Sequence, residues 1–60
     1  MIQKYDQDKG FHREIEVAWN EHDKKYEITK RGVFSKSSQG HTIQFSTVEI
    51  RLLRDMLNKI

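Results

Sequence analysis

Two runs of alternating apolar and polar residues, joined by a short polar segment, constrain the fold of this chain most strongly. In residues 11–20 the odd positions are mostly apolar and the even positions mostly polar, and residues 26–34 alternate again. A period of two is typical of β-strands with one buried face. The intervening residues 20–24 include Asn and Asp, which favour turns. The two runs therefore predict an antiparallel hairpin.

Shorter strands are predicted after this hairpin. Gly32 marks a bend or bulge, after which Val33–Ser35 is expected to run as a third strand. The polar segment Ser37–Gly40 is interpreted as a second turn. His41–Phe45 alternates once more and is expected to form a fourth strand, with its apolar residues pointing inward.

A C-terminal helix follows directly. Ser46 and Glu49 have the spacing of a capping box, in which the hydroxyl and the carboxylate bond free amides of the first turn. Apolar residues then recur at helical spacing and form a broad stripe. The residues assigned to the core or to a dimer interface are Ile50, Leu53, Met56, Leu57 and Ile60.

The predicted fold class is thus α+β, with a four-stranded antiparallel sheet followed by one C-terminal helix. Residues 1–10 have no clear period and are expected to form an N-terminal arm or an added edge strand, and residues 11–60 a single domain. A chain of 60 residues without cysteine buries little surface and has no disulfide to stabilise it. Since the helical stripe is wider than one sheet can cover, we expect a homodimer.

The sequence has no pattern typical of catalysis or metal binding. His12, His22 and His41 lie in separate segments without metal-ligand spacing. Glu14 and Glu16 share a strand face on which both are expected to be solvated. We therefore expect neither an enzyme nor a cofactor or metal. No apolar run approaches the roughly 20 residues of a membrane helix, which predicts a cytoplasmic protein without membrane contact.

Positive charge is concentrated in the middle of the chain. Residues 24–41 contain five basic residues and one acidic residue, although the net charge of the whole chain is only +2. Proteins that bind single-stranded nucleic acid combine cations with aromatic side chains on which bases stack. Trp19, Tyr26 and Phe34 are the candidate aromatics, although Trp19 shares its face with apolar residues, which favours a core position. The alternative interpretation is a solvated charged surface over an aromatic core.

Two segments resemble the PC4-like family, the transcriptional coactivator p15/PC4 C-terminal domain and its short bacterial and phage relatives. The first is Trp19-Asn20, a polar turn and Lys25-Tyr26-Glu27-Ile28. The second, from Gly40 to Leu53, combines a glycine, an apolar–polar–apolar strand and a capped helix. The resemblance covers residues 11–60 and implies a dimeric β-β-β-β-α fold that binds single-stranded DNA on curved sheet surfaces. The candidate nucleic-acid-binding residues are Lys24, Lys25, Lys30, Arg31, Phe34, Lys36, Trp19 and Tyr26.

The leading hypothesis is a homodimeric, sequence-tolerant protein that binds single-stranded DNA, or RNA, in transcription, replication or repair. The alternative is a small protein–protein interaction module, for example a phage protein that docks on a host polymerase. The acidic residues between Glu14 and Asp23 favour this alternative, because they give the surface patches of both signs. The expected partners are single-stranded nucleic acid, a second copy of the chain and, for the alternative, a protein of the transcription machinery.

Overall fold

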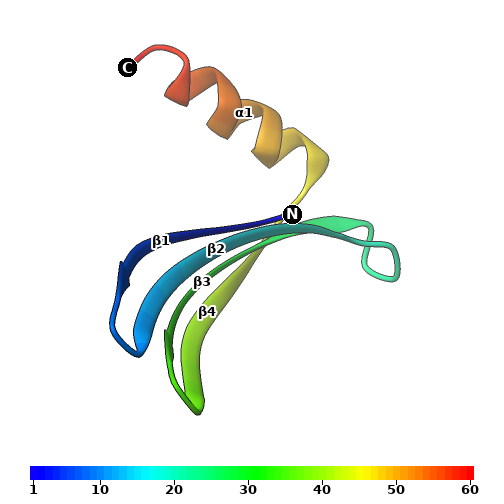
Figure 1. Cartoon of the computed structure of the whole chain (residues 1–60). Coiled ribbons are helices and arrows are strands. Elements are labelled where there is room, and N and C mark those ends of the chain that lie inside the picture. The colour runs from blue at the N-terminus through cyan, green and yellow to red at the C-terminus, as the bar shows by residue number, and fades with distance from the viewer.

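The computed structural model describes all 60 residues and consists of one four-stranded sheet followed by one helix (Figure 1). The strands are β1 (Ile2–Asp8), β2 (Phe11–Asn20), β3 (Lys25–Phe34) and β4 (Ser37–Phe45), and the helix is α1 (Thr47–Leu57). Each strand pairs antiparallel with the next along the chain, so the sheet order is β1-β2-β3-β4. The predicted fold class, a four-stranded antiparallel sheet with one C-terminal helix, is confirmed.

The four strands are not the four that the sequence predicted. Residues 1–10 contain the edge strand β1, so the edge-strand interpretation of this segment is confirmed. The separate strand at Val33–Ser35 is wrong. Gly32 stays in register between Arg13 of β2 and Gln39 of β4, so β3 continues through the glycine without a bulge.

The predicted turn at Ser37–Gly40 is also wrong, because these residues belong to β4 and the chain reverses at Ser35 and Lys36. The missed start of β4 and the strand β1 both concern the edges of the sheet. Nearly all residues of β1 and β4 are exposed, so neither strand needs the apolar–polar alternation by which a strand is recognised. The irregularity of the sheet lies instead in β1, where the register shifts between Tyr5 and Asp8 and the backbone φ angle of Asp6 is 48°.

The register of the sheet separates the side chains onto two faces, because residues directly opposite each other on neighbouring strands point to the same side. On the face toward α1, called here the helix-side face, Val17 and Ile28 lie beside Ile50, Leu53 and Leu57 of the helix. The same face of β2, β3 and β4 also carries Phe11, Arg13, Ile15, Trp19, Tyr26, Lys30, Gly32, Phe34, Gln39, His41, Ile43 and Phe45. The opposite face, called the polar face, carries the remaining strand residues.

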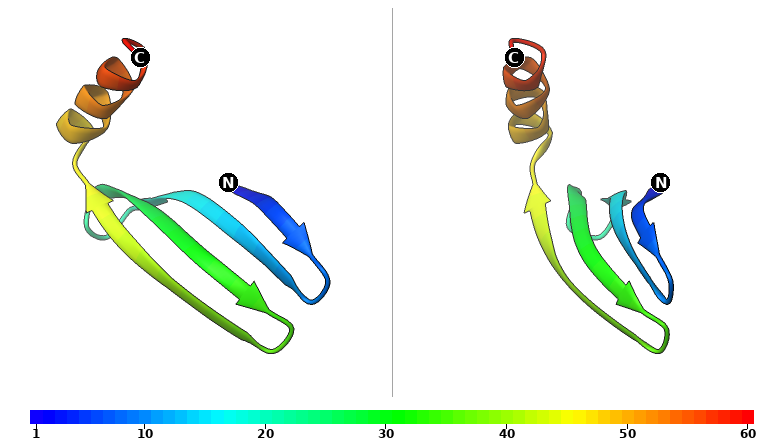
Figure 2. Two further views of the ribbon diagram at one scale, coloured as in Figure 1. Left: turned by 90° about the vertical axis from the view of Figure 1, so that its left-hand side faces the viewer. Right: turned by 60° about the vertical axis from the view of Figure 1, so that its left-hand side comes forward.

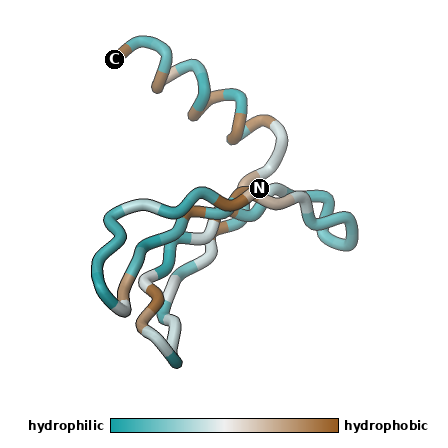
Figure 3. Tube along the Cα trace, in the orientation of Figure 1, coloured by the Kyte–Doolittle hydropathy of each residue, from teal (hydrophilic) through white to brown (hydrophobic).

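The sheet is a single curved layer, and α1 stands at one end of it (Figures 1 and 2). The helix contacts β3 and β4 near the point where the chain leaves the sheet. In Figure 3, apolar positions recur turn after turn along the helix and extend beyond this contact. The molecule measures 38 × 32 × 15 Å, and none of its 60 residues is buried. One layer with a helix at its end therefore leaves the protomer without a closed core.

The helix carries a second group of apolar side chains that faces away from the sheet. Val48, Leu52 and Met56 follow one another at intervals of four residues and so lie on one side of α1, called here the outer stripe. Their side chains are 64, 56 and 56% exposed, and Ile60 beyond the helix is fully exposed. The predicted core or interface residues are therefore divided: Ile50 and Leu53 are half-buried toward the sheet, whereas Met56, Leu57 and Ile60 stay exposed, although Leu57 lies beside Ile28.

Ser46 begins the helix with the predicted capping box. Its hydroxyl accepts a hydrogen bond from the Glu49 amide at 3.2 Å, and the Glu49 carboxylate accepts one from the Ser46 amide at 2.8 Å. The hydrogen bond from the Ser46 backbone amide lowers the pKa of the Glu49 carboxyl, and the bond with the Ser46 side chain lowers it by a smaller amount. The cap thus fixes where the chain turns from β4 into α1.

We predict that Ser46→Ala lowers the free energy of unfolding by about 1 kcal/mol at neutral pH, because the first turn loses its cap. Urea unfolding followed by circular dichroism measures this, and Thr47→Ala, which leaves the bonds between Ser46 and Glu49 in place, is the control. The lowered pKa of Glu49 means that its carboxylate stabilises the fold above the ordinary value of 4.5 and that this contribution is lost as the pH falls through the folded value. Ser46→Ala removes only the share of this effect that depends on the hydroxyl, because the Ser46 backbone amide, the larger cause, is retained. The difference between the two variants should therefore shrink only slightly in acid; a difference that grows in acid would contradict the cap's role.

Candidate nucleic-acid interface

The predicted basic residues do not form one surface. Lys30 lies on the helix-side face and Arg31 on the polar face, because consecutive strand residues point to opposite sides. Lys25 also lies on the polar face. Lys24 belongs to the turn between β2 and β3, whereas Lys36 belongs to the turn between β3 and β4 at the other end of the sheet. The run of cations in the sequence is thus divided between two faces and two ends.

Arg31 is engaged by carboxylates of the polar face. Its guanidinium lies 2.8 Å from Oε1 of Glu16 and 3.9 Å from Oε2 of Glu14, and His12 lies 3.3 Å from Glu14 on its other side. Gly40 stands directly opposite Arg31 and leaves room for it, since a Cβ at Gly40 would lie 2.6 Å from the Arg31 Cβ. With two carboxylates close to one guanidinium, Arg31 has little positive charge to offer a phosphate.

The polar face is also rich in carboxylates near the β2–β3 turn. The side-chain amides of Asn20 and Gln44 both donate to Glu27, at 3.1 and 3.0 Å, and both donate to Asp23, at 3.3 and 2.9 Å. These amides hold two carboxylates close together on one side of the sheet. A phosphate backbone would be repelled there, which makes the polar face unfavourable for nucleic acid.

Trp19 and Tyr26 lie at the end of the helix-side face where α1 begins. Their rings meet edge to face with centroids 4.8 Å apart. The Trp19 indole N–H donates to Glu21 at 2.6 Å, and the Lys24 ammonium donates to the same carboxylate. The bond from Lys24, followed by the one from Trp19, lowers the pKa of Glu21. Trp19 and Lys24 are therefore both tied to the β2–β3 turn.

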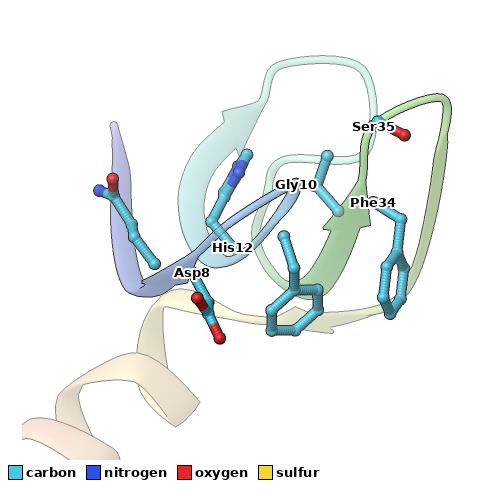
Figure 4. A pocket seen from close by; sticks show the side chains of 8 residues that line it. Asp8, Gly10, His12, Phe34 and Ser35 are labelled. Atoms are coloured by element: carbon cyan, nitrogen blue, oxygen red, sulfur yellow. The ribbon is translucent and has the colours of Figure 1, made fainter.

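Phe34 lies at the opposite end of the helix-side face, beside Phe11. The two ring centroids are 4.7 Å apart, and Phe34 is 58% exposed. The Arg13 guanidinium lies 5.3 Å from the centroid of Phe11. A hollow of about 310 Å³ opens here between the β1–β2 and β3–β4 turns, with Asp8 and Phe34 among the residues that line it (Figure 4). The structure thus presents an exposed aromatic ring with a cation close to its partner.

Three residues of this surface lie outside the set chosen from the sequence: Phe11, Arg13 and His41. Phe11 and Arg13 belong to the alternating face of residues 11–20, which the sequence assigns to a buried side. The presence of Arg13 among apolar residues was the signal by which this face could have been identified as accessible to solvent. The pairing of Phe11 with Phe34 depends on the β2–β3 register, which the sequence alone does not specify to one residue.

No group of three or more His, Asp or Glu side chains is arranged to hold a metal ion. The single helix is not long and apolar enough to cross a membrane. Comparison of this chain with protein-family models, with curated proteins and with solved structures finds no significant match. The resemblance to PC4-like proteins therefore stays a prediction from the sequence.

We predict that Arg31→Gln lowers the free energy of unfolding by about 1 kcal/mol, because Glu14 and Glu16 then lose their shared counter-charge. The guanidinium is about a quarter exposed, so solvent screening keeps the effect small. Urea unfolding measures the stability, and fluorescence anisotropy with a labelled DNA strand measures the affinity.

The matched control is Lys25→Gln, which removes the same charge from the same face, because Lys25, unlike Arg31, makes no ion pair. It should change the free energy of unfolding by less than about 0.5 kcal/mol. Neither variant should weaken binding of single-stranded DNA. A large loss of affinity in Arg31→Gln alone would mean that the polar face contacts the nucleic acid.

Proposed function

We propose that this protein is a homodimer that binds single-stranded nucleic acid without strong sequence preference, in transcription, replication or repair within the cytoplasm. The observation that carries the proposal is the contact of the exposed Phe34 ring with the half-buried Phe11 ring, with Arg13 and Lys30 on the same face. Proteins that bind single strands combine these two elements, aromatic surfaces for bases and cations for phosphates.

The aromatic pair favours a single strand over a duplex. Phe34 offers a ring surface to solvent, and a base can stack on it only after leaving its neighbours in the strand. In a duplex the bases are already stacked inside the helix. Every base has a π-face, and Arg13 and Lys30 attract any phosphate, so this surface favours sequence-tolerant binding.

A homodimer is supported by the apolar surface that one protomer leaves uncovered. The outer stripe of α1 is more than half exposed. Two apolar hollows of about 300 Å³ lie on the helix-side face, one beside Ile43 and Phe45 and the other between Val17 and Leu53. A second copy of the chain can cover such surfaces by a self-complementary contact, and dimerisation then stabilises the fold of each protomer.

We predict that Phe34→Leu weakens binding of a labelled 20-nucleotide strand by about tenfold, because a stacked base contributes about 1–3 kcal/mol. Fluorescence anisotropy at two salt concentrations, beside the matching duplex, measures this. Phe34→Tyr keeps the ring and should retain the affinity of the natural protein. Equal affinity of both variants would remove Phe34 from the interface, and absence of binding to any strand at low salt would reject the proposed function.

We predict that Leu52→Lys makes the protein monomeric, because a charge then stands in the middle of the outer stripe. Sedimentation at high micromolar concentration measures the mass, and Leu52→Met, which keeps the stripe apolar, should remain dimeric. The melting temperature of the natural protein should also rise with its concentration. A natural protein that sediments as a monomer would contradict the dimer.

The exposed outer stripe also supports a second candidate function, the protein–protein interaction module. In that case a partner protein, rather than a second copy, would cover Leu52 and Met56. A pull-down that resists nuclease and is lost in Leu52→Lys would favour this function, whereas a nuclease-sensitive pull-down would favour nucleic-acid binding.

A further inference from the structure

A second hollow on the helix-side face has Gly32 at its centre. Arg13 of β2 and Gln39 of β4 lie directly across from Gly32, on either side of it. One position further toward α1 on the same face, Lys30 pairs with His41. Because Gly32 has no side chain, the surface between these four residues forms an open hollow of about 300 Å³, whose lining also includes Arg31 and Gly40. No apolar side chain lines it, unlike the hollows near the helix.

The charges around this hollow favour an anion. Arg13 and Lys30 contribute permanent positive charge, and Gln39 contributes an amide that can donate. No carboxylate lines the hollow. The only ion pair made by these residues is between Arg13 and Asp6, at 3.7 Å, where both side chains are about half exposed or more and solvent screens the attraction. Arg13 and Lys30 are therefore available, whereas Arg31, which also lines the hollow, has its guanidinium engaged by Glu14 and Glu16.

We infer that the hollow above Gly32 is a phosphate subsite for the backbone of a bound strand. The inference rests on the proposed function, since it identifies what the strand contacts beside Phe34. Gly32 and Phe34 are two residues apart on one face of β3, which corresponds to about 7 Å along the strand. A base on Phe34 and a neighbouring phosphate in the hollow are thus placed within the reach of one nucleotide.

His41 links this subsite to pH. The groups that face it are Lys30 directly opposite on β3, Gln39 and Ile43 on its own strand, and Arg13 across the hollow. A phosphate in the hollow would favour the protonated imidazole, because opposite charges attract. A phosphodiester keeps its single negative charge throughout the range in which imidazoles titrate. Binding therefore takes up a proton, and affinity rises as the pH falls.

Gly32→Val tests the hollow without changing its charge. The backbone at Gly32 does not have a positive φ angle, and an added Cβ would meet only the Phe11 ring, at 3.5 and 3.9 Å, which is ordinary contact. Valine also suits a strand position. These distances apply to a Cβ alone, so the unfolding curve of Gly32→Ala, which adds only this atom, should match that of the natural protein, and Gly32→Val is compared with it. Affinity for a labelled thymidine 20-mer should fall about tenfold. The slope of the logarithm of the binding constant against the logarithm of the salt concentration should become less steep by roughly 0.7, the contribution of one phosphate.

A labelled abasic 20-mer, which has phosphates but no bases, separates the subsite from stacking. Gly32→Val should weaken its binding by the same factor, whereas Phe34→Leu should leave it unchanged. His41→Gln tests the proton linkage. The natural protein should bind the thymidine strand several-fold more tightly at about pH 6 than at about pH 8, and this gain should largely disappear in the variant, although His12 and His22 are still present.

The outcomes distinguish the two proposals. If the natural protein binds the thymidine strand but Gly32→Val and His41→Gln leave affinity, salt dependence and pH dependence unchanged, the phosphate subsite is wrong and the proposed function stands. If no strand binds, the proposed function fails. An NMR titration with inorganic phosphate then tests whether the hollow binds an anion. Shifts confined to Gly32, Lys30 and His41 would support an anion site for free phosphate, and their absence would overturn it.

Discussion

The structure depends on one constraint: a single-layer sheet of four strands is covered at one end by one short helix. A sheet normally buries one face against a second layer, and here that layer extends over only part of the face. Backbone pairing therefore holds the strands in register, while the side chains of both faces stay accessible to solvent. The same incomplete cover leaves the outer stripe and the aromatic end of the sheet available to partners. The surface that the helix leaves uncovered is thus the surface on which both proposals, the dimer and the nucleic-acid site, are built.

The helix-side face divides into two halves with different chemistry. Near α1 it is apolar, with Val17, Ile28 and Ile43 beside the helix or its hollows. Away from α1 it is aromatic and basic, with Phe34 and Arg13 as its main groups. The first half is suited to packing and the second to a charged, stackable ligand. The two halves meet at Lys30 and His41, which line both the apolar hollow beside Ile43 and the polar hollow above Gly32.

Two glycines of β3 and β4 act on opposite faces of the sheet. Gly40 leaves room for Arg31 on the polar face, where any larger residue would collide with the backbone of β3 and with Arg31. A Cβ at Gly32 would meet only the Phe11 ring, at an ordinary contact distance, and the missing side chain leaves the hollow on the helix-side face. The first glycine is required by packing, whereas the second is compatible with a side chain.

Much of the local structure could be predicted because it depends on neighbours in sequence. The hairpin of β2 and β3 follows from alternation, and the start of α1 follows from the Ser46 and Glu49 cap, whose bonds span three residues. The edge strand β1 and the true start of β4 could not be recognised, because exposed edge strands have no buried side to impose a pattern. The candidate site was predicted only in part: Phe34 and Lys30 share its surface, whereas Arg31 does not.

By itself, the sequence determined the fold class, the start of the helix and the presence of cations and aromatic residues along the strands and turns of the sheet. Only the tertiary structure decided which of these residues act together. Strand residues alternate between faces, so Lys30 and Arg31, adjacent in the chain, point to opposite sides, and the register then places Arg31 among carboxylates and Lys30 beside His41. Phe11 meets Phe34 for the same reason, across 23 positions of sequence. Cross-strand pairing sets these neighbours, and it is a long-range property that no local pattern contains.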